Sequence, residues 1–125
     1  MAFRFQAVAA ALIAVSLPAQ IAAQASAPPP AISLEQRTLL RCAAAFALVA
    51  HDQAAGDPGA SKWPDLRERG REFFVRASAQ LMDEAGLTRA QVAALMEEAA
   101  RDFRQQDTLD RAMPPCLLTL EASGI

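Results

Sequence analysis

Apolar residues recur along the chain at helical spacing, in segments separated by short runs rich in Gly, Pro and polar residues. The most apolar of the later segments runs from Cys42 to Ala50, is rich in alanine and contains neither Gly nor Pro. Alanine is the strongest helix former, and a helix that is apolar on most sides is normally buried. The pattern predicts a buried helix over residues 34–54, with Ser33 as its N-cap and Gln36 completing a capping box.

A second helical segment follows a loop rich in Gly and Pro at residues 56–61. Pro64 suits the first turn of a helix, and Gly86 is a natural stop, so we expect a helix over residues 64–85. Glycine inside a helix costs about 1 kcal/mol relative to alanine, so Gly70 indicates a close approach to the alanine-rich helix. The stripe predicted to face the core consists of Leu66, Gly70, Phe73, Ala77 and Leu81.

The third segment has the clearest start, because Thr88 and Gln91 form a capping box and Leu87 with Val92 forms a hydrophobic staple. The short turn after the second helix makes the two helices antiparallel neighbours. The stripe that we expect to face inward consists of Val92, Leu95, Met96, Ala99 and Phe103.

The N-terminus has the pattern of a secretory signal peptide over residues 1–25. Arg4 precedes the apolar run Phe5–Leu17, and Ala23-Gln24-Ala25 offers a small-residue cleavage site. The run is shorter than the roughly 20 residues that a spanning helix needs. We expect cleavage after this motif, leaving a proline-rich spacer over residues 26–32 and a helical bundle domain over residues 33–125. An uncleaved membrane anchor is the alternative.

Cys42 and Cys116 are the only cysteines, and two cysteines in an exported chain are typical of one disulfide. Such a bond between residues 74 positions apart would stabilise the fold by about 4 kcal/mol through the entropy of the unfolded chain. A redox-active pair is the alternative, although it usually has a C-x-x-C spacing that is missing here.

The predicted disulfide limits the length of the third helix. If that helix ran to Ala112, it would end about 35 Å above the base of the bundle, whereas Cys42 would lie about 12 Å above it. The three residues that remain before Cys116 span only about 10 Å. We therefore expect a break near Gln106-Asp107, a returning segment capped by Asp107, and a last short turn introduced by Pro114-Pro115.

These elements predict an all-α fold: a small antiparallel bundle of three main helices plus a short C-terminal helical segment, closed by one disulfide. Removal of residues 1–25 leaves 11 basic and 14 acidic side chains, a net charge of −3. This mildly acidic balance gives no reason to expect nucleic acid or an anionic membrane surface as a partner.

The single histidine, His51, falls in the last turn of the first helix, where the helix dipole favours it. A catalytic triad would need a serine, but Ser61 and Ser78 lack the context of a nucleophile elbow. Haem ligation in a helical bundle is conceivable with a methionine as second ligand, although no C-x-x-C-H motif exists. The methionines in question are Met82, Met96 and Met113. Core packing is the favoured interpretation, so we expect no catalytic residue and no cofactor.

Acidic residues suggest two further alternatives. Glu98 and Asp102 lie four positions apart, and paired acids serve glycoside hydrolysis, but a solvated helix face is favoured. The acids around the loop at residues 56–61 do not have the spacing of an EF-hand calcium loop. These acids are Asp52, Asp57 and Asp65. We therefore expect no metal site.

Three large apolar residues, Phe73-Phe74-Val75, follow one another on the second helix, and one face cannot bury all of them. Val75 points away from Phe73, toward Met82 seven positions on. Either the C-terminal segment at Leu117–Leu120 covers this apolar strip, or the strip is exposed and marks an association site. The second case suggests a self-complementary helix contact between two copies.

Three stretches resemble small exported, uncharacterised helical proteins of alphaproteobacteria that have one cysteine pair. The stretches are Arg41-Cys42-Ala43-Ala44-Ala45-Phe46, Arg69-Gly70-Arg71-Glu72-Phe73-Phe74-Val75 and Pro114-Pro115-Cys116-Leu117. The resemblance implies export and supplies no activity. We expect a periplasmic or secreted binding or interaction module, with a periplasmic chaperone or stress-response protein as the alternative and an enzyme as the third choice.

Overall fold

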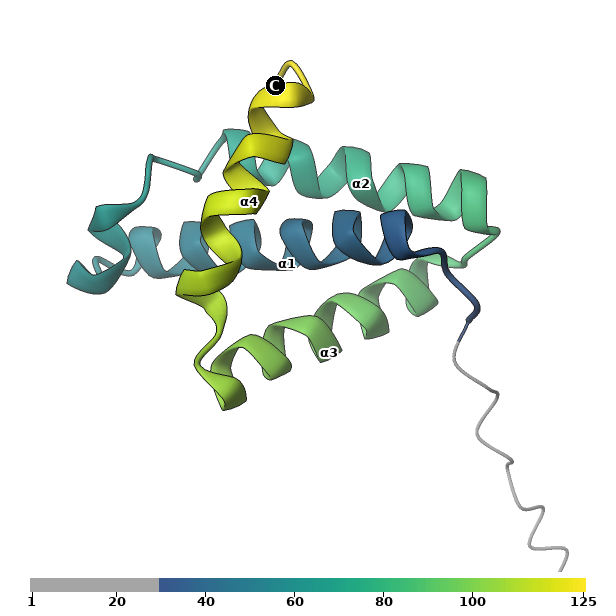
Figure 1. The fold of residues 1–125 in the computed structure, drawn as a ribbon, viewed down its shortest axis with the longest axis horizontal. Coiled ribbons are helices and arrows are strands. Elements are labelled where there is room, and N and C mark those ends of the chain that lie inside the picture. The colour runs from purple at the N-terminus through teal and green to yellow at the C-terminus, as the bar shows by residue number, and fades with distance from the viewer. Residues whose placement is uncertain (1–29) are drawn as a thin grey trace, which may run out of the picture.

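α1 (Leu34–Ala54) lies at the centre of the molecule, with three other helices packed around it (Figure 1). The computed structural model describes residues 30–125, so the expected signal peptide and residues 26–29 of the expected spacer lie outside the described residues. α2 and α3 flank α1 on two sides, and α4 crosses it at a steep angle. The elements after α1 are η1 (Pro58–Lys62, a 3-10 helix), α2 (Arg69–Ala85), α3 (Arg89–Gln106) and α4 (Leu109–Ala122).

α1 begins where the sequence predicts. The Ser33 hydroxyl accepts a hydrogen bond from the Gln36 backbone N–H at 3.1 Å, and the Gln36 side chain accepts one from the Ser33 N–H at 2.9 Å. From Cys42 to Phe46, five consecutive side chains are each at most 3% exposed. Successive helical residues point about 100° apart, so neighbouring elements cover α1 on every side at this level.

α2 begins later than predicted. Pro64 does not start the helix, which begins at Arg69, and the predicted loop at residues 56–61 contains most of η1. Leu66 is buried as expected, but it lies in the connection before α2. The predicted end is confirmed, because Gly86 follows Ala85 in the left-handed conformation with φ of 64°.

The side chain of Gln53 explains the late start of α2. Its amide nitrogen donates to the carbonyl oxygens of Ala60 and Trp63 at 3.3 Å and of Pro64 at 2.8 Å. Its amide oxygen accepts from the Leu66 N–H at 2.9 Å. The Gln53 side chain, near the end of α1, thus forms hydrogen bonds with four backbone groups of the connection. These groups therefore do not need hydrogen-bond partners inside a helix.

Gly70 brings α2 close to α1, as predicted. A Cβ at this position would lie 3.2 Å from Leu66 Cβ and 3.3 Å from Phe46 Cβ. The contact on α1 is therefore with the residue that follows the alanines. Phe46 also meets Phe73 edge to face, with ring centroids 5.1 Å apart.

α3 has the predicted start and the predicted break. Thr88 and Gln91 form the capping box, and the helix ends at Gln106. Asp107 has a different role from the one expected: it adopts the left-handed conformation with φ of 50° and terminates α3, and its side chain does not cap α4. Thr108 is the N-cap of α4.

α4 is longer than the short turn predicted after Pro114-Pro115, because both prolines lie inside one continuous helix. Proline interrupts a helix by removing an N–H that would bond four residues back. Here the carbonyl groups that lose this bond belong to Asp110 and Arg111, and both residues are exposed, so water can take the place of the missing donors.

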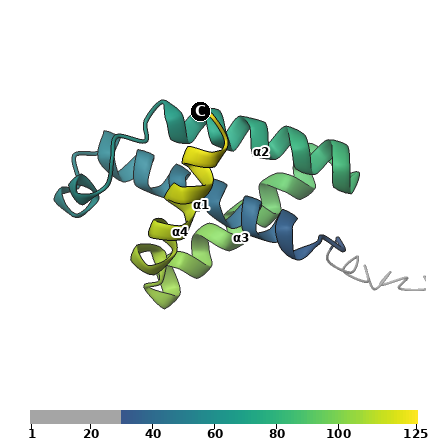
Figure 2. The ribbon, with the colours of Figure 1, turned by 45° about the horizontal axis from the view of Figure 1, so that its top comes forward.

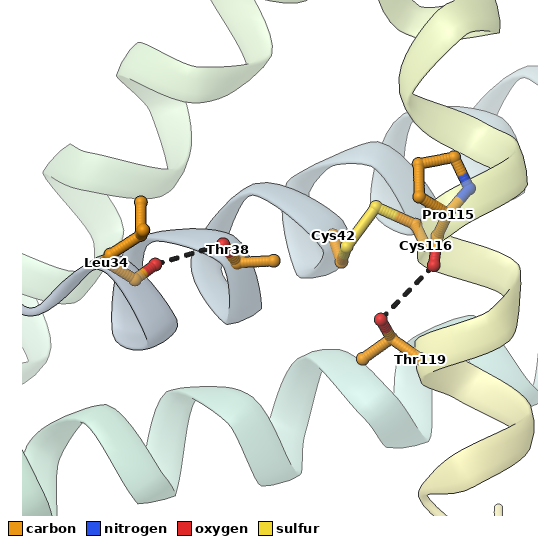
Figure 3. Close-up of a disulfide and its surroundings, with 6 residues drawn as sticks. All are labelled: Leu34, Thr38, Cys42, Pro115, Cys116 and Thr119. Atoms are coloured by element: carbon orange, nitrogen blue, oxygen red, sulfur yellow. Dashed lines mark hydrogen bonds between the residues drawn. A yellow bond between two sulfur atoms is a disulfide. The ribbon is translucent and has the colours of Figure 1, made fainter.

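The predicted disulfide between Cys42 and Cys116 is confirmed, with an S–S distance of 2.07 Å (Figure 3). It joins the third turn of α1 to the middle of α4. Met113, Cys116 and Leu120 of α4 are buried against the core. The all-α bundle with one disulfide is therefore the fold of the described residues, and no helix among them is long and apolar enough to span a membrane.

Polar contacts hold the two ends of α4. Lys62 forms an ion pair with Asp110 at the start of the helix. At the other end, Arg69 binds the Glu121 carboxylate at 2.8 Å and the Ile125 main-chain oxygen at 2.8 and 3.1 Å. Exposed pairs of this kind contribute at most about 1 kcal/mol each, so the disulfide and the buried apolar face hold α4 on α1.

Replacing both cysteines with alanine is expected to lower the free energy of unfolding by about 4 kcal/mol, because the 74-residue separation no longer restricts the unfolded chain. Urea unfolding of the oxidised protein, the reduced protein and the double variant gives the comparison. The reduced protein should match the variant. A loss below about 1 kcal/mol would contradict the prediction.

Gln53→Ala is expected to cost about 2 kcal/mol of folding stability, because the Trp63 and Pro64 carbonyls and the Leu66 N–H lose their partner at once. Gln80→Ala is the matched control, since the Gln80 amide is exposed and reaches only Glu84 at 3.2 Å. Its effect should stay within about 0.5 kcal/mol. Equal changes in the two variants would show that Gln53 does not organise the connection.

Candidate functional site

The predicted apolar strip on α2 is only partly open. Val75 is 59% exposed, whereas Met82 is half-buried and packs against the core. The C-terminal segment does not cover Val75: Leu120 is fully buried and Leu117 packs on the core. Val75 is therefore the open member of the pair, and its role as a partner surface remains a prediction.

His51 lies in the last turn of α1, as predicted, and it is exposed. The serine hydroxyls considered beside it make local bonds. Ser61 donates to the Pro58 carbonyl and Ser78 to the Phe74 carbonyl, both at 2.7 Å. Met96 and Met113 are buried in the core, which is the packing role favoured by the sequence.

The acids around the α1–α2 connection bind three different partners. Asp57 accepts from the Gly59 N–H at 2.8 Å, and Asp52 accepts from Arg104 at 3.2 Å. The side-chain hydrogen bonds from Arg67, at 2.6 and 2.9 Å, lower the pKa of Asp65 to about 2. Among residues 30–125, no three His, Cys, Asp or Glu side chains are grouped closely enough to hold a metal ion.

Glu98 and Asp102 line a groove of about 530 Å³ between α1 and α3, which we name the α1–α3 groove. This volume is within the range of small-molecule and peptide pockets. Residues 30–32, which precede α1, form a third side. The helical residues that line the groove are Arg37, Leu40 and Arg41 of α1 and Leu95, Glu98, Ala99 and Asp102 of α3.

Each wall of the groove carries charges of one sign. Arg37 and Arg41 lie one turn apart on α1, and Glu98 and Asp102 lie one turn apart on α3. Arg41 and Asp102 are paired, with a nitrogen–oxygen distance of 4.0 Å. The Arg41 guanidinium also lies 4.5 Å from the centre of the Phe103 ring, a cation–π contact that holds it in place.

The charges of Arg37 and Glu98 are available to a ligand. Among the described residues, neither Arg37 nor Glu98 has an ion-pair partner within 4.0 Å, and both side chains are exposed. The partly exposed Leu95 supplies apolar surface between the charged walls, with the buried Leu40 and Ala99 behind it. The groove therefore presents one available charge of each sign next to an apolar surface.

The sequence identified the acidic residues of one groove wall, Glu98 and Asp102, but not the basic residues of the other. Arg37 and Arg41 have the same i,i+4 spacing. The spacing alone places each pair on one helix face. That the two faces lie opposite each other depends on the packing of α3 against α1, which no local pattern encodes.

The fold and the groove define the class of the described region: a disulfide-linked helical bundle with a charged groove between two helices. No protein-family model, no curated protein and no solved structure matches the chain.

Proposed function

We propose that this chain is an exported helical binding module, periplasmic or secreted, that binds its partner in the α1–α3 groove. The observation that carries the proposal is the pair of available, opposite charges, Arg37 and Glu98, on the two walls of a groove with an apolar floor.

The proposed compartment rests on two features. The first 25 residues have the pattern of a cleaved export signal. Cys42 and Cys116 form a disulfide, and such bonds persist mainly in oxidising compartments.

Binding is a better match to the groove than catalysis. Glycosidase carboxyl groups flank the scissile bond from two sides. Glu98 and Asp102 instead lie one turn apart on a single helix, and Asp102 is paired with Arg41. We therefore assign these acids to recognition.

The chaperone alternative has less support. A chaperone needs a continuous apolar surface that unfolded chains can bind. The large apolar side chains exposed on the described residues are Leu34, Val75 and Leu118, and they lie on three different helices, α1, α2 and α4.

Site-specific photo-crosslinking in a Gram-negative host tests the proposal. The full chain with p-benzoylphenylalanine in place of Ala31, an exposed residue that lines the groove and leaves all four of its charges in place, should be found in the periplasm or medium, processed after Ala25, and crosslinked to a defined partner. The matched control carries the crosslinker in place of Ala94, which is also exposed but lies outside the groove. Crosslinks of the same partner from both positions, or from neither, would contradict binding in the groove.

Self-association through α2 is a second candidate, favoured by the 59% exposure of Val75. In a two-fold contact, Val75 and the nearby part of Met82 on one copy would meet the same residues of the other. Val75→Glu should then convert a sedimenting dimer into a monomer without loss of helicity. Leu118→Glu makes the same chemical change on α4, where the side chain is 73% exposed, and should leave the dimer intact. A wild-type protein that is monomeric at high concentration would refute the contact.

A further inference from the structure

α1 and α3 run in the same direction, as Figures 1 and 2 both show. This direction matters for the groove, because each helix carries an i,i+4 pair of equal charges on its groove wall. Because the two helices are parallel, the two residues of each pair follow one another in the same direction along the groove. Arg37 and Glu98 are the first members of their pairs, and Arg41 and Asp102 are the second members.

Arg41 and Asp102 form an ion pair with each other, whereas Arg37 and Glu98 do not. A side-chain nitrogen of Arg41 lies 4.0 Å from a carboxylate oxygen of Asp102, and the Phe103 ring lies against the Arg41 guanidinium. Arg37 and Glu98, one helical turn nearer the start of α1, line the same hollow without an ion-pair partner among the described residues. The groove thus has a closed end and an open end, and the open end presents one positive and one negative charge.

A ligand that suits the open end must carry both charges. A single anion near Arg37 would also meet Glu98 and Asp102, and a single cation near Glu98 would meet Arg37 and Arg41. Like charges on the same groove oppose binding, whereas a ligand with both signs satisfies each wall. The partly exposed Leu95 on the apolar floor can add affinity for an apolar group between the two charges.

We propose that the α1–α3 groove binds peptide segments in which a basic and an acidic side chain flank an apolar one. The acidic group binds Arg37, the basic group binds Glu98, and the apolar side chain packs on Leu95. This assignment rests on the proposed binding function and adds the chemical class of the partner.

The test uses the exported, oxidised protein and four blocked tripeptides. Acetyl-Lys-Leu-Glu-amide carries both charges, its Gln-for-Glu and Gln-for-Lys relatives carry one each, and acetyl-Gln-Leu-Gln-amide carries none. Dissociation constants come from NMR titration of the backbone amides. The doubly charged peptide should bind at least about tenfold more tightly than the neutral one, and the amides that shift should be those of the groove.

Two variants assign each charge to its wall. In Arg37→Gln the advantage of the glutamate peptide over its glutamine relative should disappear, while the advantage of the lysine remains. Glu98→Gln should show the reverse pattern, which is the logic of a double-mutant cycle. Glu97→Gln and Arg111→Gln are matched controls on exposed positions outside the groove, and they should bind all four peptides like the wild type.

Equal binding of all four peptides, or saturable shifts outside the groove, would overturn the assignment. So would a failure of all four to bind. In each case the crosslinking from position 31 decides separately on the proposed function: a partner captured there but not from position 94 would leave the binding module standing with another class of ligand.

Discussion

Burial of α1 on all sides is the constraint on which the rest of the structure depends. Five consecutive residues, from Cys42 to Phe46, are almost inaccessible to solvent, and three of them are alanines. Two flanking helices leave one side of a central helix open, so a further element has to cover it. α4 does this by crossing α1 with Met113 and Leu120 facing inward, and the disulfide fixes the crossing point. Small side chains on α1 let its neighbours pack closely, as the contact between Gly70 and Phe46 shows.

Much of this arrangement could be predicted because its signals are local. Capping boxes mark the starts of α1 and α3, since the bonds that define them join residues three positions apart. The break after α3 followed from a different argument: a helix that ran to Ala112 would have left too few residues for Cys116 to reach Cys42. The predicted role of Asp107 was wrong: its left-handed backbone ends α3, and its side chain does not cap the start of α4.

The errors occur where a distant group decides the local structure. Pro64 has the sequence context of a helix start, yet Gln53 binds the surrounding backbone from the end of α1 and delays α2 until Arg69. Pro114 and Pro115 suggest a helix end, yet α4 continues through them because the buried residues on either side, Met113 and Cys116, anchor it to the core. Proline in a helix interior costs about 3 kcal/mol, so the burial of the α4 face together with the disulfide has to outweigh a substantial local penalty there.

The groove follows from the same packing. α3 lies along α1 so that Phe103 and Met96 can reach the core, and this places the flank of α3 that carries Glu98 and Asp102 against the flank of α1 that carries arginines. One pair of charges closes and the other stays available, and this outcome depends on the register of the two helices, because a shift of one helical turn would set Arg41 opposite Glu98 or Arg37 opposite Asp102. The charged pairs add little to folding stability, because exposed ion pairs contribute at most about 1 kcal/mol. Their alignment in a hollow therefore adds little to the stability of the bundle, and it is the feature on which the proposed recognition of a ligand with both charges rests.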